Sequence, residues 1–367
     1  MHHKKIKILF LLKKGSNGYD NSYLPSFTNS LKIKSGLNNS ANFVSQALEK
    51  YFNVETKVTT CIDGNSIDKE VHLYKPNICI IEAIWVTSEK MAELSKLHPK
   101  VTFIIRVHSR TTFLANEGVA IDRIKGYNKI KNVFVSFNHP VTNSEFNAIG
   151  IQSIYLPNIY EVIPESESCL ERILDFLWPK HRRKKKIINI GCFGAIRPMK
   201  NHLLQAIGAI RYGEENNKKI RFHINSSRTE QKGENVLKNL RSLFKDSRHE
   251  LVEHQWMEHQ DFLNLVSKMD IGLQVSLSES FNIVTADFVA QKVPVIVSEE
   301  ISWVDDICKF KTNDSKTIAE KIKEFLKTPK KVINKNLDAI NKYEKHALNT
   351  WKEFLKYYKH NLKNTKC

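Results

Sequence analysis

Short apolar segments alternate with helix-like segments along most of this chain, and the whole series occurs twice. Alternation of this kind predicts parallel sheets with helices on both faces. In the first series the predicted strands are 6–12, 54–61, 78–83, 101–108, 133–138 and 154–156, and the predicted helices include 40–52 and 88–96. The first half is therefore expected to form a Rossmann-like α/β domain.

The second series begins after an irregular stretch that ends in basic residues. Its predicted strands are 187–193, 220–225, 251–252, 271–275 and 295–297, and its predicted helices are 201–211, 236–244, 261–268 and 286–291. With 367 residues the chain is long enough for two such domains. The boundaries we expect are an N-terminal domain over 1–165, a linker over 166–186, a second Rossmann-like domain over 187–345 and a C-terminal helix over 346–367.

That C-terminal helix is predicted from the spacing of its apolar residues. Trp351, Phe354, Leu355 and Tyr358 fall on one face of a helix over 349–362. Such a face needs another surface to cover it.

The chain is strongly basic, with a formal net charge of +18. Its lysine-rich, asparagine-rich and isoleucine-rich usage favours a biased coding composition as one explanation, and an anionic partner is the other. The basic run over 180–186 is most simply a solvated linker, but it also fits contact with DNA or an anionic membrane. No Cys-x-x-Cys pair, signal-type apolar region or membrane-length stretch occurs, so we expect a cytoplasmic protein.

Residues that follow predicted strands are the first candidates for a site, because parallel sheets bind ligands at the carboxyl ends of their strands. The segment 191–201 contains Gly194, which permits a close turn, and Arg197 and Lys200, which place two cations at the start of a helix. Helix N-termini favour anions. This segment therefore suits a diphosphate, although a plain strand-to-helix turn with two solvated cations has the same pattern.

A second candidate segment, 276–287, follows the strand over 271–275. Glu279 lies in its polar loop, and Asp287 is expected in the first turn of the next helix. The two carboxylates can accept hydrogen bonds from sugar or ribose hydroxyls, and the amides between them can face a phosphate. The simpler alternative is that Asp287 only complements the helix dipole.

Weaker candidates lie elsewhere. The long polar loop from Gly15 to Asn39 offers Ser35, Gly36 and Asn38, and His108 ends a predicted strand. His254 and His259 are flanked by glutamates, but their separation of five residues does not match a His-x-x-x-His pair, so no metal site is expected.

The order of these segments resembles a known family. Gly194 to Lys200, Trp256, Asp270 to Ser276, and Glu279 to Asp287 followed by Val293-Pro294-Val295 are similar to the donor domain of retaining GT-B glycosyltransferases, the broad glycogen-synthase-like family that includes many bacterial mannosyl- and glucosyltransferases. The likeness covers essentially all of 187–300. More loosely, Val107-His108 and 156–159 resemble that family's acceptor domain, while 61–65 and 191–201 also resemble glycosyltransferase-like proteins of bacteriophages.

The resemblance implies an architecture and a set of roles. Two Rossmann-like domains would face each other across a cleft, and the C-terminal helix would pack back toward the N-terminal domain. Lys200 would hold the donor phosphates, Glu279 would contact the transferred sugar, Asp287 would bind the ribose and His108 would sit beside the reacting sugar. The remaining residues would line the donor, as amides facing the sugar and diphosphate or as borders of the base: Ser280, Phe281, Asn282, Ile283, Asn225 and Trp256.

Two positions depart from the family pattern. The family usually has arginine directly after the glycine, where this chain has Ala195, so Arg197 can substitute only if the loop turns it inward. The second acidic position is usually glutamate, and here it is the shorter Asp287.

The reaction implied is sugar transfer from a UDP-, GDP- or ADP-linked donor to an unidentified acceptor, with retention. Preorganised cations and amides would stabilise the charge that develops on the leaving diphosphate. The resemblance also implies metal independence, and the chain has no Asp-x-Asp motif. Two alternatives stay open: transfer to hydroxylated bases of phage DNA, and a sugar-nucleotide or nucleic-acid binding protein of the same fold without catalysis.

Overall fold

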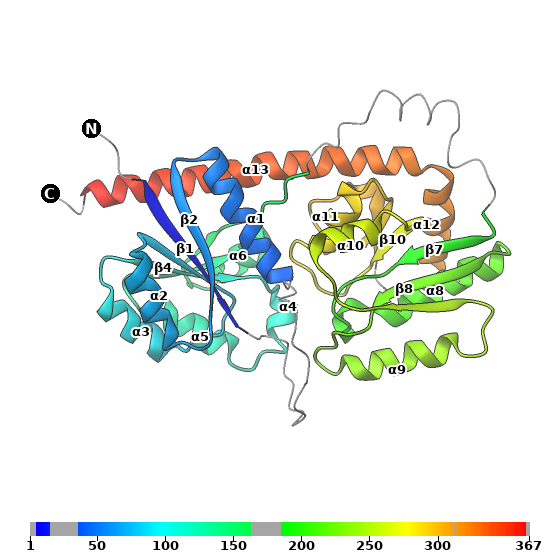
Figure 1. The fold of residues 1–367 in the computed structure, drawn as a ribbon, viewed down its shortest axis with the longest axis horizontal. Coiled ribbons are helices and arrows are strands. Elements are labelled where there is room, and N and C mark those ends of the chain that lie inside the picture. The colour runs from blue at the N-terminus through cyan, green and yellow to red at the C-terminus, as the bar shows by residue number, and fades with distance from the viewer. Residues whose placement is uncertain (1–4, 15–35, 163–184, 312, 365–367) are drawn as a thin grey trace.

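A computed structural model describes residues 5–14, 36–162, 185–311 and 313–364. It contains two six-stranded sheets, one in each half of the chain, in which every strand pairs in parallel with its neighbours (Figure 1). The predicted two-sheet α/β architecture is confirmed.

The first sheet has the strand order β2-β1-β3-β4-β5-β6. Its strands are β1 (Ile6–Lys13), β2 (Val54–Cys61), β3 (Ile78–Glu82), β4 (Thr102–Val107), β5 (Val133–Phe137) and β6 (Ser153–Tyr155). Its helices are α1 (Gly36–Tyr51), α2 (Ser66–Tyr74), α3 (Ser88–Leu97), α4 (Thr111–Leu114), α5 (Ala120–Tyr127) and α6 (Pro140–Ala148). Of these helices, α1 and α3 overlap the two ranges predicted individually, 40–52 and 88–96.

Strand β1 shows why the sheet is covered on both faces. Its residues are apolar without a break, so both faces of the strand require burial. Leu9 and Leu11 pack with the side of the sheet that carries α2, α3 and α5, whereas Ile8 and Phe10 pack with α1.

The second sheet has the order β12-β11-β10-β7-β8-β9. Its strands are β7 (Ile187–Gly191), β8 (Lys219–Asn225), β9 (Glu250–His254), β10 (Ile271–Gln274), β11 (Val295–Ser298) and β12 (Lys309–Phe310). Its helices are α8 (His202–Glu215), α9 (Gly233–Phe244), α10 (His259–Val266), α11 (Ile283–Ala290) and α12 (Ser315–Lys327), with short 3-10 turns at Pro198–Lys200 and Asp306–Cys308. Counted within this half, the order is the 3-2-1-4-5-6 of a doubly wound dinucleotide-binding sheet.

The last helix, α13 (Pro329–Asn364), is the longest and runs along both halves (Figure 1). Val332 and Ile340 pack into the core of the C-terminal half, and Trp351 and Leu355 pack into the core of the N-terminal half. The predicted return of the C-terminal helix to the N-terminal half is therefore confirmed. The helix begins twenty residues before the predicted 349, and the proposed boundary between 345 and 346 falls inside it, because the polar first half of α13 hides its periodicity.

Two further observations bear on the sequence predictions. No helix in the described part of the chain has both the length and the apolar character needed to cross a membrane. The predicted linker falls outside the described residues except for Lys185 and Lys186, and the Lys185 ammonium pairs with Asp270.

Candidate functional site

Two adjoining cavities lie where the carboxyl ends of the two sheets face each other. The larger, of about 270 Å³, has walls from both halves of the chain, and the smaller measures about 50 Å³. In the second sheet β7 lies between β8 and β10, so the strand order reverses there and opens a crevice for ligands. The residues that line both cavities, and so mark their junction, are Gly36, Gly194, Trp256, Ile283 and Val284.

The main candidates from the sequence, together with Gly36 from the polar loop, line one or both cavities, whereas Asn38 lines neither. The larger cavity is lined by Gly36, His108, Gly194, Arg197, Lys200, Trp256, Glu279, Ser280, Phe281, Asn282 and Ile283, and the smaller one adds Asn225 and Asp287. The structure thus brings the predicted set together in space, and their roles stay predictions.

Gly194 forms the tight turn after β7. Its φ of +115° lies in the region that side chains rarely adopt, and its amide donates to Asn225 Oδ1 at 3.0 Å. A Cβ at this position would lie 3.8 Å from Lys200 Nζ. The glycine therefore keeps the backbone open toward the cavity directly beside the lysine ammonium.

Lys200 and Glu279 form an ion pair in the larger cavity. Their side chains are only 11% and 8% exposed, so the pair lies largely out of bulk water. The loops that carry them are joined by a hydrogen bond from the Leu277 amide to the Met199 carbonyl, 2.8 Å long. The fold therefore holds these two predicted site residues, Lys200 and Glu279, against each other.

The amides between Ser280 and Ile283 lie at the N-terminus of α11. Asn282 has a left-handed φ of 57°, and its side chain accepts from the Thr285 amide at 2.9 Å and donates to Gln274 at 3.0 Å. Phe281 is buried against Trp303, whose indole donates to the Phe281 carbonyl at 2.7 Å. This local packing fixes where the free amides of the helix point.

Asp287 lies in the second turn of α11, not in the first turn as the sequence suggested. The earlier start of the helix at Ile283 moves it away from the helix terminus. Its Oδ1 accepts hydrogen bonds from the Tyr160 hydroxyl and from His259 Nε2, each 2.7 Å long. Asp287 is therefore a hydrogen-bonded acceptor rather than a simple dipole cap.

The two partners of Asp287 have shifted pKa values. Burial, the charge of Asp287 and the hydrogen bond raise the pKa of Tyr160 well above its ordinary value, so the phenol keeps its proton and donates. Burial lowers the pKa of His259, but the hydrogen bond to Asp287 and its charge outweigh burial, and the pKa is raised overall. His259, considered above only as a metal ligand, therefore acts as a hydrogen-bond donor to the Asp287 carboxylate.

Arg197 turns toward the cavity from the donor-side loop, yet it has neighbours of its own. Its Nη1 lies 3.3 Å from Glu230, and its guanidinium lies 4.7 Å from the ring of Phe113 in the N-terminal half. A second arginine, Arg228, reaches the same cavity and pairs with the same Glu230 at 2.6 Å. Arg228 was not among the predicted site residues, although it follows strand β8 and so lies near a strand end, where parallel sheets bind their ligands.

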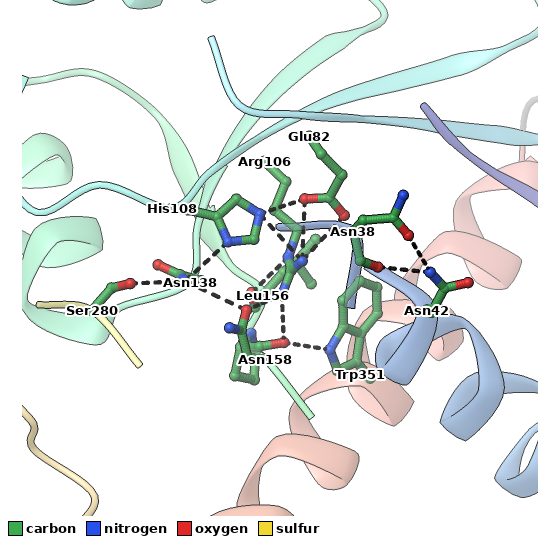
Figure 2. Close-up of polar contacts among 11 residues, drawn as sticks. Asn38, Asn42, Glu82, Arg106, His108, Asn138, Leu156, Asn158, Ser280 and Trp351 are labelled. Carbon is green, nitrogen blue, oxygen red and sulfur yellow. Dashed lines mark hydrogen bonds and ion pairs between the residues drawn. The ribbon is translucent and has the colours of Figure 1, made fainter. Parts of the chain in front are cut away.

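His108 directly follows β4 and belongs to a buried polar network (Figure 2). Its Nε2 contacts Glu82, and its Nδ1 lies 3.3 Å from the Asn138 amide. Burial raises the pKa of Glu82, but Arg106 and His108 outweigh burial and lower it overall, so Glu82 is a carboxylate. Because a carboxylate only accepts, Nε2 carries the proton and Nδ1 accepts from Asn138.

Burial favours the neutral form of His108. Burial lowers the pKa of His108, the charge of Glu82 opposes this, and the net shift is downward. Both ring nitrogens of His108 are paired, one with Glu82 and the other with Asn138. The residue lines the larger cavity.

Arg106 connects this network to α13. It is fully buried, donates to Glu82 and to the carbonyl of Pro157, and the Trp351 indole donates to that same carbonyl at 2.9 Å (Figure 2). The C-terminal helix thus reaches the carboxyl edge of the first sheet. The spacing of residues along the sequence does not predict this link between Arg106 and α13.

Polar contacts cross the cleft between the halves. Asn138 donates to Ser280 at 3.1 Å, and Thr112 donates to Ser278 at 2.6 Å. Arg110 Nη1 lies 3.2 Å from Glu300. The halves are therefore in a closed arrangement around the larger cavity.

The remaining residues named from the sequence are Asn38, Ser35 and His254. Asn38 lies in α1, where it accepts a hydrogen bond from Asn42, and Ser35 lies outside the described residues. His254 stacks on His223 with ring centroids 5.2 Å apart. No group of three metal-ligating side chains occurs among the residues that the structure describes.

Comparison with solved structures identifies the fold. The chain is similar to sucrose-phosphate synthase of Thermosynechococcus elongatus, with a TM-score of 0.66 and 12% identity over 97% of this chain and 100% of that one. It is also similar to an E. coli trehalose-6-phosphate structure bound with UDP-2-fluoro glucose (TM-score 0.64, 11% identity, 96% of this chain and 99% of that one). A UDP-forming α,α-trehalose-phosphate synthase of Burkholderia vietnamiensis gives a TM-score of 0.63 at 9% identity, over 98% of each chain.

At the sequence level, no protein-family model and no curated protein matches this chain. The identities to the solved structures are low, so these likenesses concern the fold. The chain has the GT-B fold, with two Rossmann-like halves facing across a cleft.

Proposed function

We propose that this protein is a glycosyltransferase that transfers a sugar from a nucleotide-diphosphate sugar to an acceptor bound by the N-terminal half. The observation that carries the proposal is the Lys200–Glu279 pair in the larger cavity, beside the open turn at Gly194 and the N-terminus of α11. Together these groups offer a cation, backbone donors and a hydroxyl acceptor around one space.

The two cavities suit the two ends of such a donor. The nucleoside would occupy the smaller cavity beside Asn225, Trp256 and Asp287, and the sugar would occupy the larger one. The hydrogen bonds from Tyr160 and His259 both use Oδ1 of Asp287, so Oδ2 is the atom we propose for the ribose hydroxyls. The diphosphate would then lie at the junction, near Gly194.

Charge development explains how these residues would promote transfer. As the bond between the anomeric carbon and the phosphate oxygen breaks, negative charge grows on the leaving diphosphate. Lys200, with Arg197 and the α11 amides, would stabilise that charge more strongly than the charge of the intact donor. Once the Lys200 ammonium pairs with the phosphate, the Glu279 carboxylate is released from its ion pair and can accept hydrogen bonds from the sugar.

The positions of the carboxylates favour retention. Among the described residues, the acids lining the cavities are Glu230, Glu279 and Asp287, all from the C-terminal half. An inverting reaction needs a base on the acceptor side. His108 borders the larger cavity on that side, but both its ring nitrogens are already paired, with Glu82 and Asn138. In the retaining reaction the leaving phosphate oxygen takes the acceptor proton, and the new bond forms on the face from which the leaving group departs.

The direct test is a binding and turnover experiment with UDP-, GDP- and ADP-linked sugars. UDP-sugars are the first choice, since two of the similar structures are described with UDP. Binding is expected to raise the melting temperature, and turnover is expected to release the nucleoside diphosphate. Absence of binding to all three classes would overturn the proposal, while binding without turnover on any acceptor would identify a non-catalytic sugar-nucleotide binding protein.

Retention of the anomeric configuration is tested by a separate measurement. With a donor that turns over, NMR of the first product formed is expected to show the anomeric configuration of the donor. A product of opposite configuration would contradict the retaining assignment while leaving glycosyl transfer in place.

A further inference from the structure

The loop after β8 lies directly against the loop that carries Gly194 and Lys200. The Ile196 amide donates to the Arg228 carbonyl, and the Glu230 amide donates to the Ile196 carbonyl, each at 2.9 Å. A parallel bridge joins Ile196 to Thr229. Arg228 is thereby delivered next to Ala195, the position at which the sequence lacks a cation.

The shape of this second loop is fixed by its backbone. Gln231 and Lys232 both have left-handed φ angles, of 50° and 67°. A Cβ on the next residue, Gly233, would lie 1.9 Å from the carbonyl oxygen of Ile196. Side-chain residues in this conformation are strained, and they persist where the surrounding structure holds them, commonly at ligand sites.

The Arg228 guanidinium lies beside the junction of the two cavities. It is 4.9 Å from the ring centroid of Trp256, and Trp256 lines both cavities. A ligand that fills both cavities has its connecting segment at this junction. In a nucleotide-diphosphate sugar, that connecting segment is the diphosphate.

The local charges leave Arg228 able to take an anion. Arg228 and Arg197 share one carboxylate, that of Glu230. Arg228 Nε is buried and has no hydrogen-bond partner among the described residues. Guanidinium groups bind phosphate oxygens through two parallel hydrogen bonds, so this side chain matches the chemistry of a diphosphate.

We propose that Arg228 is a second diphosphate-binding cation, acting beside Lys200 from a separate, preformed loop, with Glu230 holding its guanidinium in place before the donor arrives. This inference rests on the proposed function, because it assigns one contact within the same donor site. It also distinguishes Arg228 from Arg197, whose guanidinium packs on Phe113 across the cleft.

The test compares ligands that differ only in phosphate number. Whichever of UDP, GDP and ADP binds the wild type would be titrated by calorimetry, together with its monophosphate and its nucleoside. Arg228→Gln is expected to weaken diphosphate binding by about 10- to 100-fold, the effect of one charge-assisted hydrogen-bonding group. Nucleoside binding is expected to stay within about twofold, and Arg228→Lys is expected to recover part of the diphosphate affinity.

The control is Arg221→Gln, since Arg221 lies on β8, pairs with Glu250 and does not line either cavity.

The outcomes separate the two proposals. Arg228→Gln binding the diphosphate as tightly as the wild type would overturn this inference alone. Equal loss of nucleoside and diphosphate binding would also overturn it, by showing that Arg228 only supports Trp256. A wild type that binds none of the three diphosphates would instead remove the proposed function.

Discussion

The Lys200 ammonium and the Glu279 carboxylate neutralise each other in a space with little water, and each is costly to leave alone. Removing one partner of a largely buried pair leaves an uncompensated charge, whereas replacing both with neutral side chains of similar volume is better tolerated. The stability of the empty protein and its activity should therefore respond differently to single and double substitutions at this pair.

We expect Lys200→Ala to lower kcat/KM for sugar transfer by about 10²- to 10³-fold, the usual cost of removing one group that stabilises developing negative charge. Its melting temperature should fall, and the double variant Lys200→Met/Glu279→Gln should regain stability but not activity. Steady-state kinetics and thermal unfolding check both expectations. Lys321→Ala, at a surface pair with Glu324, is the control; full activity in Lys200→Ala would contradict the site.

The His259–Asp287 contact should make stability depend on pH. The pKa of His259 is raised in the folded protein, so its contribution is fully present below the unfolded pKa of about 6.5 and is lost as the pH rises through the folded value. The difference in unfolding free energy between the wild type and His259→Gln should therefore shrink from about pH 6 toward about pH 9 in urea titrations. A difference that grew with pH would contradict the ion pair.

Helix α13 is the element that joins the two cores. Its first part packs in the C-terminal half, and Trp351 lies fully buried in the N-terminal half with its indole bonded to Pro157. The helix therefore acts as structural support for both halves at once.

Truncating the buried indole should cost far more than truncating an exposed ring on the same helix. Trp351→Ala is expected to lower the free energy of unfolding by about 3–5 kcal/mol. Tyr357→Ala, at a position 68% exposed, is expected to stay within about 0.5 kcal/mol of the wild type. Denaturant unfolding measures both, and equal effects would show that α13 does not belong to the core.

The strands and helices were well predicted from the sequence where burial determines the pattern of apolar residues. Strand β1 is apolar throughout because both its faces are covered, and Val54–Cys61 has the predicted bounds. The first half of α13 was missed because helix-period apolar residues are sparse among its lysines and asparagines. Several helices of the first half, such as α6, were not predicted individually because they are short.

At the site, residues next to strand ends were predictable and residues gathered by tertiary packing were not. Gly194, Lys200 and Glu279 follow β7 and β10, where parallel sheets place their ligands. Tyr160 and His259 contact Asp287 from distant parts of the chain, so no spacing in the sequence predicts these contacts. Glu82 ends β3 and has its role only through Arg106 and His108 on the neighbouring strand.

For the whole molecule, the two halves meet across the cleft through a few polar contacts and the packing of Arg197 on Phe113. Net contributions of such hydrogen bonds are about 0.5–1.5 kcal/mol each, so opening is within thermal reach when the cavity is empty. A donor that contacts both walls would shift the population toward the closed form.

Weakening these contacts should therefore open the protein in the absence of ligand. Thr112→Ala combined with Arg110→Ala removes the partners of Ser278 and Glu300. The radius of gyration measured by small-angle X-ray scattering should increase relative to the wild type and should decrease again with saturating donor. An unchanged radius in the empty double variant would show that these contacts do not hold the halves together.

The dual packing of α13 also sets an order of events during synthesis. Ile159 and Trp351 belong to the same core cluster but are 351 minus 159, or 192, positions apart. Ribosomes add about 5–20 residues per second, so the N-terminal sheet waits about 10–40 s for the α13 side chains that complete the cover of the face on which α1 also packs. Throughout that interval the nascent chain exposes an apolar surface, which makes it a natural client for chaperones before the C-terminal half is complete.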